Sequence, residues 1–137
     1  MVLQSTPTVT SGEERLWGEL TGEEGDHFGF LPPRIPFEDA DRQLDTMTNR
    51  SGYDPAPYWE RTRIPSLWLF GEWDKSIPAL RSARRAGEWR TKGAPFEVIV
   101  LPEANHGLMI ARGPRKKRLA YPAPELWTSI DRWLVQR

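Results

Sequence analysis

Two short runs of apolar residues in the second half of the chain have the pattern of β-strands. The first occupies residues 66–70 and ends at Gly71, and the second occupies residues 96–101 and ends at Pro102. An unbroken apolar run with turn residues at its ends is typical of a strand covered on both faces, as in parallel sheets. Because the second run is also rich in β-branched residues, both runs predict buried, parallel strands.

The residues between these runs, 79–92, have the pattern of an amphipathic helix. Leu80, Ala83 and Gly87 fall on one side and several arginines on the other, which predicts that the first three face the sheet. A strand, a helix and a second strand form a βαβ unit with a right-handed crossover. The pattern therefore predicts an α/β fold with two parallel strands and flanking helices.

A second amphipathic pattern lies near the C-terminus. Apolar residues recur there at the i, i+4, i+7 and i+8 positions of one helical face, namely Leu126, Ile130, Trp133 and Leu134. The helix is expected to begin at Pro124 and Glu125, since proline is favoured in a first turn. Of the seven tryptophans, we expect Trp68, Trp127 and Trp133 in the core, because a buried indole removes a large apolar area from water.

Residues 1–52 have a weaker pattern. Ser11-Gly12-Glu13-Glu14 fits a capping box, which predicts a short helix, and a second weak helix is expected at about residues 37–47. Glycines and prolines interrupt the remainder. We therefore expect a mostly helical, loop-rich segment, similar to a cap or lid, at residues 1–52 and an α/β segment at residues 53–137.

Composition and charge narrow the function classes. The 19 basic and 19 acidic residues give a formal net charge of zero, so no general attraction to nucleic acid or anionic membranes is expected. The absence of cysteine excludes a disulfide framework, a thiolate nucleophile and a thiolate zinc site. No stretch approaches the roughly 20 apolar residues of a membrane helix. A soluble, cytoplasmic protein without membrane or nucleic-acid partners is expected.

Two polar residues follow the predicted strands in the positions where chemistry is usually found. Asp74 lies four positions after Phe70, and His106 lies five after Leu101. Loops at the carboxyl ends of parallel strands converge on one crevice, and neighbouring strands lie about 4.8 Å apart, so the two side chains are expected to meet. A carboxylate bonded to one imidazole nitrogen orients the ring and leaves the other nitrogen free to accept a proton from a nucleophile.

Alternatives exist for each of these residues. Asp74 is of a type that commonly caps the following helix, and Glu72 is the second choice for the acid. His106 is alternatively a solvated loop histidine, although its position after a buried strand favours the catalytic role. Trp73, beside the acid, is a candidate for lining a substrate pocket.

Two further features have weaker functional interpretations. A basic cluster, Arg112, Arg115, Lys116, Lys117 and Arg118, resembles a phosphate-binding run, but it lacks the interleaved aromatic residues that stack on bases, so a solvated loop is the preferred interpretation. His27 lies near Glu24 and Asp26 without a cysteine or second histidine at ligand spacing. No metal or cofactor is therefore expected.

The stretch from residue 53 to residue 137 resembles the C-terminal part of the α/β hydrolases, in particular their dienelactone-hydrolase-like and prolyl-oligopeptidase-like branch. The separation of Asp74 and His106, 106 minus 74 or 32 residues, suits this family. The motifs that carry the resemblance are Tyr53-Asp54-Pro55 with Trp59, residues 64–74, Ile77-Pro78, residues 101–107 and the helix containing Trp133.

The resemblance implies hydrolysis of an ester or amide bond by a Ser-His-Asp triad, with Asp74 as the acid and His106 as the base. In that family the nucleophile lies upstream, in a Gly-x-Ser-x-Gly elbow, and this sequence contains no such motif. We therefore expect the chain to be inactive alone and to need an N-terminal hydrolase half, or a homo-oligomer that covers the sheet edge. The alternative is a non-catalytic α/β binding or interaction module derived from the hydrolase scaffold.

Overall fold

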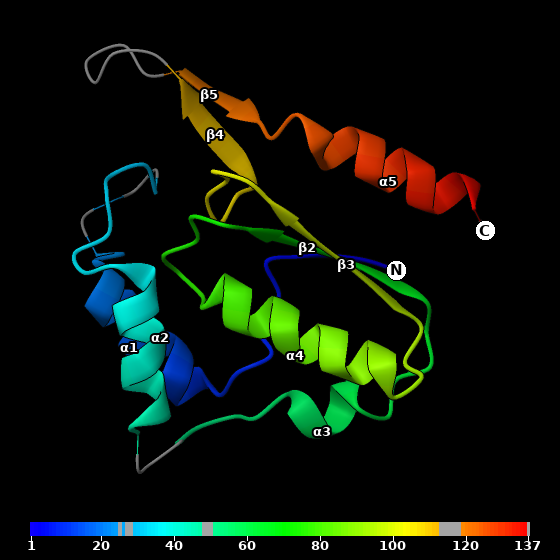
Figure 1. Ribbon diagram of the computed structural model, residues 1–137, viewed down its shortest axis with the longest axis horizontal. Helices are drawn as coiled ribbons and strands as arrows, with labels where there is room; N and C mark the ends of the chain where they lie inside the picture. The colour runs from blue at the N-terminus through cyan, green and yellow to red at the C-terminus, as the bar shows by residue number, and fades with distance from the viewer. Residues whose placement is uncertain (25, 27–28, 48–50, 113–118, 137) are drawn as a thin grey trace.

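The computed structural model describes the chain except for residues 25, 27–28, 48–50, 113–118 and 137 (Figure 1). Its centre is a parallel sheet of three strands in the order β1 (Val2–Gln4), β2 (Ser66–Gly71) and β3 (Phe96–Leu101). The strands β2 and β3 confirm the two that were predicted. Strand β1 was not predicted, because three residues are too few to show a hydrophobic period.

Helices surround the sheet, and the chain is mixed α/β, as predicted. They are α1 (Ser11–Thr21), α2 (Phe37–Asp45), α3 (Ala56–Trp59), α4 (Ala79–Thr91) and α5 (Glu125–Val135). Between β3 and α5 the chain forms an antiparallel hairpin of β4 (Met109–Arg112) and β5 (Leu119–Pro122), which was also not predicted. None of the helices described is long and apolar enough to cross a membrane.

The core lies on both faces of β2, whose six residues are all buried. Successive residues of a strand point to opposite faces. Leu67 accordingly packs with Trp133 of α5 in one apolar cluster, whereas Trp68 and Phe70 pack with Trp89 of α4 in another. Helices α4 and α5 thus cover opposite faces of the sheet, as Figure 1 shows. The edge strand β3 is less enclosed, since its four central residues are only partly buried.

The buried face of α4 differs from the prediction. Its buried residues are Ala79, Ser82, Ala86 and Trp89, whereas Leu80 is 43% exposed. The Trp89 and Trp68 ring centroids lie 6.4 Å apart, so the face of α4 that carries Trp89 packs on the sheet. The prediction that Leu80 faces the sheet was therefore wrong, since the buried face of the helix is the one that carries Ala86 and Trp89.

The prediction for α5 is correct in part. Leu126 and Trp133 are buried and Ile130 packs against the same cluster, but Leu134 is 57% exposed and Trp127 is 62% exposed. Neighbouring helix positions are about 100° apart, so Trp127 points away from the sheet that Leu126 faces. Placing Trp127 in the core was wrong.

Helix α1 begins one residue earlier than predicted. Its capping box is formed by Thr10, whose hydroxyl accepts from the Glu13 amide at 3.2 Å, and by Glu13, whose carboxylate accepts from the Thr10 amide at 2.9 Å. The helix packs on α2, where Trp17 stacks on Phe37 at 5.5 Å between ring centroids. Thus the first segment does contain two helices, but through β1 it also supplies a strand to the sheet.

Candidate functional site

The predicted acid lies in the acid loop, residues 72–78, which follows β2 and leads into α4. Asp74 is 1% exposed. Its Oδ1 accepts hydrogen bonds from the amides of Ser76 at 2.8 Å and Ile77 at 3.0 Å. This is a local turn of the kind that Asp side chains commonly stabilise. Because α4 begins only at Ala79, after Pro78, Asp74 holds the turn before the helix and does not cap the helix itself.

The predicted base lies in the histidine loop, residues 102–108, which follows β3. This loop passes directly over the end of β2 at Gly71, where a Cβ atom would lie 2.2 Å from the Asn105 carbonyl oxygen and 2.4 Å from that of Ala104. Real Cβ contacts are never this short, so only glycine allows the crossing. The crossing carries His106 back from β3 across the end of β2.

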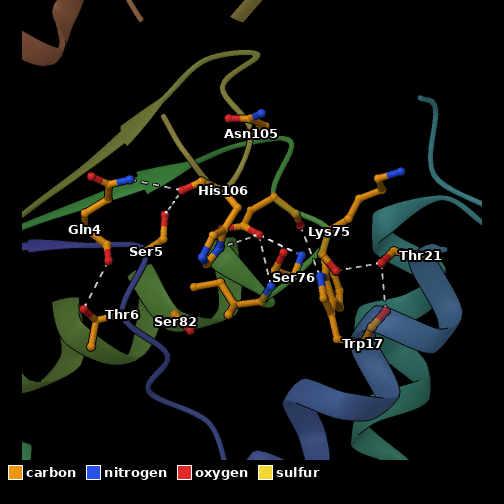
Figure 2. A network of polar contacts seen from close by, with 12 residues as sticks. Gln4, Ser5, Thr6, Trp17, Thr21, Lys75, Ser76, Ser82, Asn105 and His106 are labelled. Atoms are coloured by element: carbon orange, nitrogen blue, oxygen red, sulfur yellow. Dashed lines mark hydrogen bonds and ion pairs between the residues drawn. The ribbon is translucent and has the colours of Figure 1, made fainter. Parts of the chain in front are cut away.

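The two predicted residues come together beyond the carboxyl ends of β2 and β3, and Figure 2 shows His106 with the residues around this contact. His106 Nδ1 lies 3.0 Å from Asp74 Oδ2 and 3.2 Å from Oδ1. With a proton on Nδ1 the ring donates to the carboxylate, and Nε2 becomes the nitrogen available to a substrate or nucleophile. The carboxylate is fully enclosed, whereas the imidazole side chain is 50% exposed. The alternative acid, Glu72, instead accepts a hydrogen bond from the Glu103 amide at 3.0 Å.

The surroundings of His106 favour its protonated form. The hydrogen bond to Asp74 raises the pKa of the imidazole above its ordinary value of 6.5, and this outweighs the lowering caused by partial burial. The negative charges of Asp74, Glu23 and Glu14 raise the pKa further. Burial, followed by the neighbouring charge of Glu23, raises the pKa of the Glu14 carboxyl above 4.5. The ring therefore lies in a region of negative potential.

A cavity of about 460 Å³ opens beside His106. Its lining combines charged groups with apolar ones, among them Phe30, Met109 and Ala120. Trp73, the sequence candidate for a pocket residue, is not part of this lining and is 43% exposed. A small molecule in this cavity can therefore reach the imidazole.

Helix α1 holds the acid loop through hydrogen bonds that the sequence did not predict. The Trp17 indole donates to the Asp74 carbonyl at 3.1 Å. The Thr21 hydroxyl lies 2.9 Å from the Lys75 carbonyl oxygen and 2.8 Å from the Trp17 carbonyl oxygen. Its one proton is divided between these two acceptors. Because these contacts join positions 57 and 54 residues apart, no local pattern could have revealed them.

A buried ion pair joins the acid loop to the segment after α1. The ammonium group of Lys75, which is 4% exposed, pairs with the carboxylate of Asp26, whose side chain is 7% exposed. Asp26 also accepts from the amides of Phe30 at 3.2 Å and Leu31 at 2.9 Å. Burial opposes ionisation of Asp26, but the hydrogen bonds from Lys75 and these amides outweigh it, so the pKa of Asp26 lies below 3.8. Asp26 is therefore ionised and is engaged by Lys75.

Strand β1 holds the histidine loop through the carbonyl group of His106. The Ser5 hydroxyl donates to this carbonyl at 2.7 Å and the Gln4 amide group at 3.4 Å (Figure 2). Ser5 is therefore bonded to the main chain of the histidine, and Ser76 is a second serine nearby, in the lining of the cavity. Neither lies in a Gly-x-Ser-x-Gly motif.

The remaining sequence candidates lie outside the part of the chain that the structure describes. These are His27 and, in the basic cluster, Arg115, Lys116, Lys117 and Arg118. Among the described residues, no group of three or more histidine, aspartate or glutamate side chains is arranged to hold a metal ion. Comparisons with protein-family models, with curated proteins and with solved structures find no match to this chain.

Proposed function

We propose that this chain supplies the acid and the base of a serine-hydrolase site, with Asp74 and His106 as two members of a Ser-His-Asp triad. The observation that carries the proposal is the 3.0 Å contact between Asp74 Oδ2 and His106 Nδ1, made at the carboxyl ends of two adjacent parallel strands. The chain acts on an ester or amide substrate, in the cytoplasm, only when a complementary hydrolase segment provides the nucleophile.

The proposed mechanism assigns a separate task to each residue. The Asp74 carboxylate accepts a hydrogen bond from the Nδ1–H group of His106, which fixes the tautomer and stabilises the imidazolium once it forms. His106 accepts the proton of the serine hydroxyl at Nε2 while the serine oxygen bonds to the substrate carbonyl carbon. The same nitrogen then returns the proton to the leaving alcohol or amine, and an acyl-enzyme remains for water to hydrolyse.

The burial of the two side chains supports this division of tasks. A carboxylate that is enclosed and bonded to two amides stays fixed, as an orienting group must. An imidazole that is half exposed beside a cavity is accessible from the other side. A purely structural His–Asp pair has no need of such access, so the geometry favours catalysis.

The experiment begins with the reading frame immediately upstream, where we expect an in-frame Gly-x-Ser-x-Gly segment. Co-expressed with that segment, the chain should cleave p-nitrophenyl acetate and the complex should be labelled by a fluorophosphonate probe, whereas the chain alone does neither. In the complex, His106→Gln should lower kcat by about 10⁴-fold or more, as in other triads. His27→Gln, at the only other histidine, is the matched control and should keep full activity.

Two results count against the proposal. One is a complex that keeps its activity after His106→Gln. The other is labelling of the chain alone, because it locates a nucleophile such as Ser5 or Ser76 within these 137 residues.

A non-catalytic binding module is the second candidate, and the missing nucleophile motif is the observation that favours it. Such a module needs no complementary segment. It should be a monodisperse monomer with one cooperative melting transition, and the upstream reading frame should contain no elbow motif. A dimer or larger species in size-exclusion chromatography would instead indicate an assembly role through the open edge of β1.

A further inference from the structure

Ser5 occupies an unusual place at the end of β1. Its amide donates to the Leu69 carbonyl at 2.8 Å, so β1 is still paired with β2 at this residue. The side chain is nevertheless turned toward the histidine loop, and the residue is 5% exposed. Ser5 thus links the first strand of the sheet to a loop that belongs to the third.

The backbone of Ser5 has a positive φ of 43°. A residue with a Cβ atom rarely adopts this conformation, and where it does, the surrounding contacts hold it there. Here those contacts are the pairing with Leu69 on one side and the 2.7 Å bond from the hydroxyl to the His106 carbonyl on the other. The strain and the hydrogen bond therefore occur together in one residue.

The position of the imidazole depends on the main chain of the histidine loop. Within the described residues, the ring has hydrogen-bond contacts with the Asp74 carboxylate alone. On its far side the loop is closed by Asn105, whose amide donates to the Met109 carbonyl at 2.9 Å and whose side-chain oxygen accepts from the Met109 amide at 3.0 Å. On the β1 side, Ser5 and Gln4 supply the corresponding contacts.

We propose that Ser5 is a positioning residue for His106, and that its hydroxyl fixes the main chain of the histidine loop so that the imidazole meets Asp74. Its importance for catalysis rests on the proposed hydrolase function, but its effect on the geometry of the pair does not. Gln4 assists from a longer distance, 3.4 Å.

The test is a histidine NMR titration of the full chain, without substrate, in three variants. Ser5→Ala removes the hydroxyl and keeps the strained backbone, whereas Ser5→Gly removes the hydroxyl and relieves the strain. Thr6→Val is the matched control, since it removes the adjacent hydroxyl, which bonds to the Gln4 carbonyl at 3.3 Å and does not touch the pair. Both Ser5 variants should lower the pKa of His106 toward 6.5 and shift the NMR resonance of Nδ1, because the hydrogen bond to Asp74 is weakened, whereas Thr6→Val should change neither.

A merely structural role gives a different result. In that case Ser5→Ala and Ser5→Gly change the melting temperature but leave the titration curve of His106 at its wild-type position, which overturns the proposal. Should neither variant fold, Gln4→Met provides the second measurement, because this exposed residue contacts the same carbonyl. A small fall in the pKa of His106 supports the proposal, and an unchanged curve contradicts it.

The titration also separates this inference from the proposed function. A shifted titration in a chain that fails the complementation assay retains the positioning role and rejects the hydrolase. An unchanged titration in a chain that passes the assay rejects only the role of Ser5.

Discussion

The acid loop and the histidine loop differ in how firmly the protein holds them. Asp74 and Lys75 are 1% and 4% exposed; α1 and the segment after it bond to this loop, and Asp74 holds the loop from within by accepting from the Ser76 amide. The His106 side chain is 50% exposed, and its loop is fixed mainly through main-chain carbonyl and amide groups. Both loops contribute buried residues to the core, Ile77 from the acid loop and Ala104 and Leu108 from the histidine loop, so the contrast lies in the two functional side chains and the contacts that hold them.

The difference follows from what each group has to do. An orienting carboxylate acts best when it is enclosed and cannot turn, because rigid donors and acceptors need no reorganisation during the reaction. A base has to reach another molecule, so one edge of its ring must stay open. The residues before β2 therefore form a frame for the pair, with α1 beneath the acid and β1 beside the base.

The largest expected effect comes from breaking the buried ion pair beneath the acid loop. Lys75→Met leaves the carboxylate of Asp26 enclosed without its cation, and removing one partner of such a pair costs about 3 kcal/mol of unfolding free energy. Urea denaturation followed by circular dichroism measures the loss. The double variant Lys75→Met/Asp26→Asn is the control, and it should recover part of the stability because no uncompensated charge remains.

A loss below about 1 kcal/mol in Lys75→Met, the range of surface ion pairs, would show that water reaches this pair. In that case the acid loop is no more firmly held than the histidine loop, and the contrast between them disappears.

The next effect in size concerns the acid itself. Asp74→Asn keeps the shape of the side chain but removes the charge that Ser76, Ile77 and His106 share, and hydrogen bonds to charged groups contribute about 2 kcal/mol. The same change should lower the pKa of His106 toward 6.5, because the hydrogen bond to the Asp74 carboxylate is the main cause of the raised pKa. Glu72→Gln is the matched control in the same loop, and NMR titration of both variants decides whether Asp74 or Glu72 acts on the imidazole.

Much of this arrangement could be predicted from sequence because its signals are local. The bounds of β3, the start of β2 and the start of α4 follow from apolar runs flanked by proline and glycine. The meeting of Asp74 and His106 follows from the general rule that loops converge at the carboxyl ends of parallel strands. Both members of the candidate pair were therefore identified from their positions after the strands.

The frame around the pair could not be predicted, for physical reasons. Strand β1 has three residues, and its place is decided by backbone pairing with β2, which any side chain permits. Trp17, Thr21 and Ser5 act on main-chain carbonyl groups, which every residue carries, so their partners leave no mark in the sequence. Lys75 and Asp26 lie far apart in the sequence and meet only because the fold brings the acid loop against the segment after α1. Charged residues so far apart in a sequence are usually solvated, so nothing in the sequence marks them as a pair.

The smallest expected effect is the pH dependence contributed by His106. Its pKa in the folded chain lies above 6.5, so the folded state binds this proton more tightly than the unfolded state does. The resulting stabilisation is complete below about pH 6.5 and is lost as the pH rises through the folded-state pKa. Wild type should therefore exceed His106→Gln in unfolding free energy by more at about pH 5.5 than at about pH 9. The difference should be under about 1 kcal/mol, because solvent screens a half-exposed ring. With His27→Gln as the control, an advantage of wild type that grows with pH would mean that the histidine loop holds a neutral imidazole, as firmly enclosed as the acid.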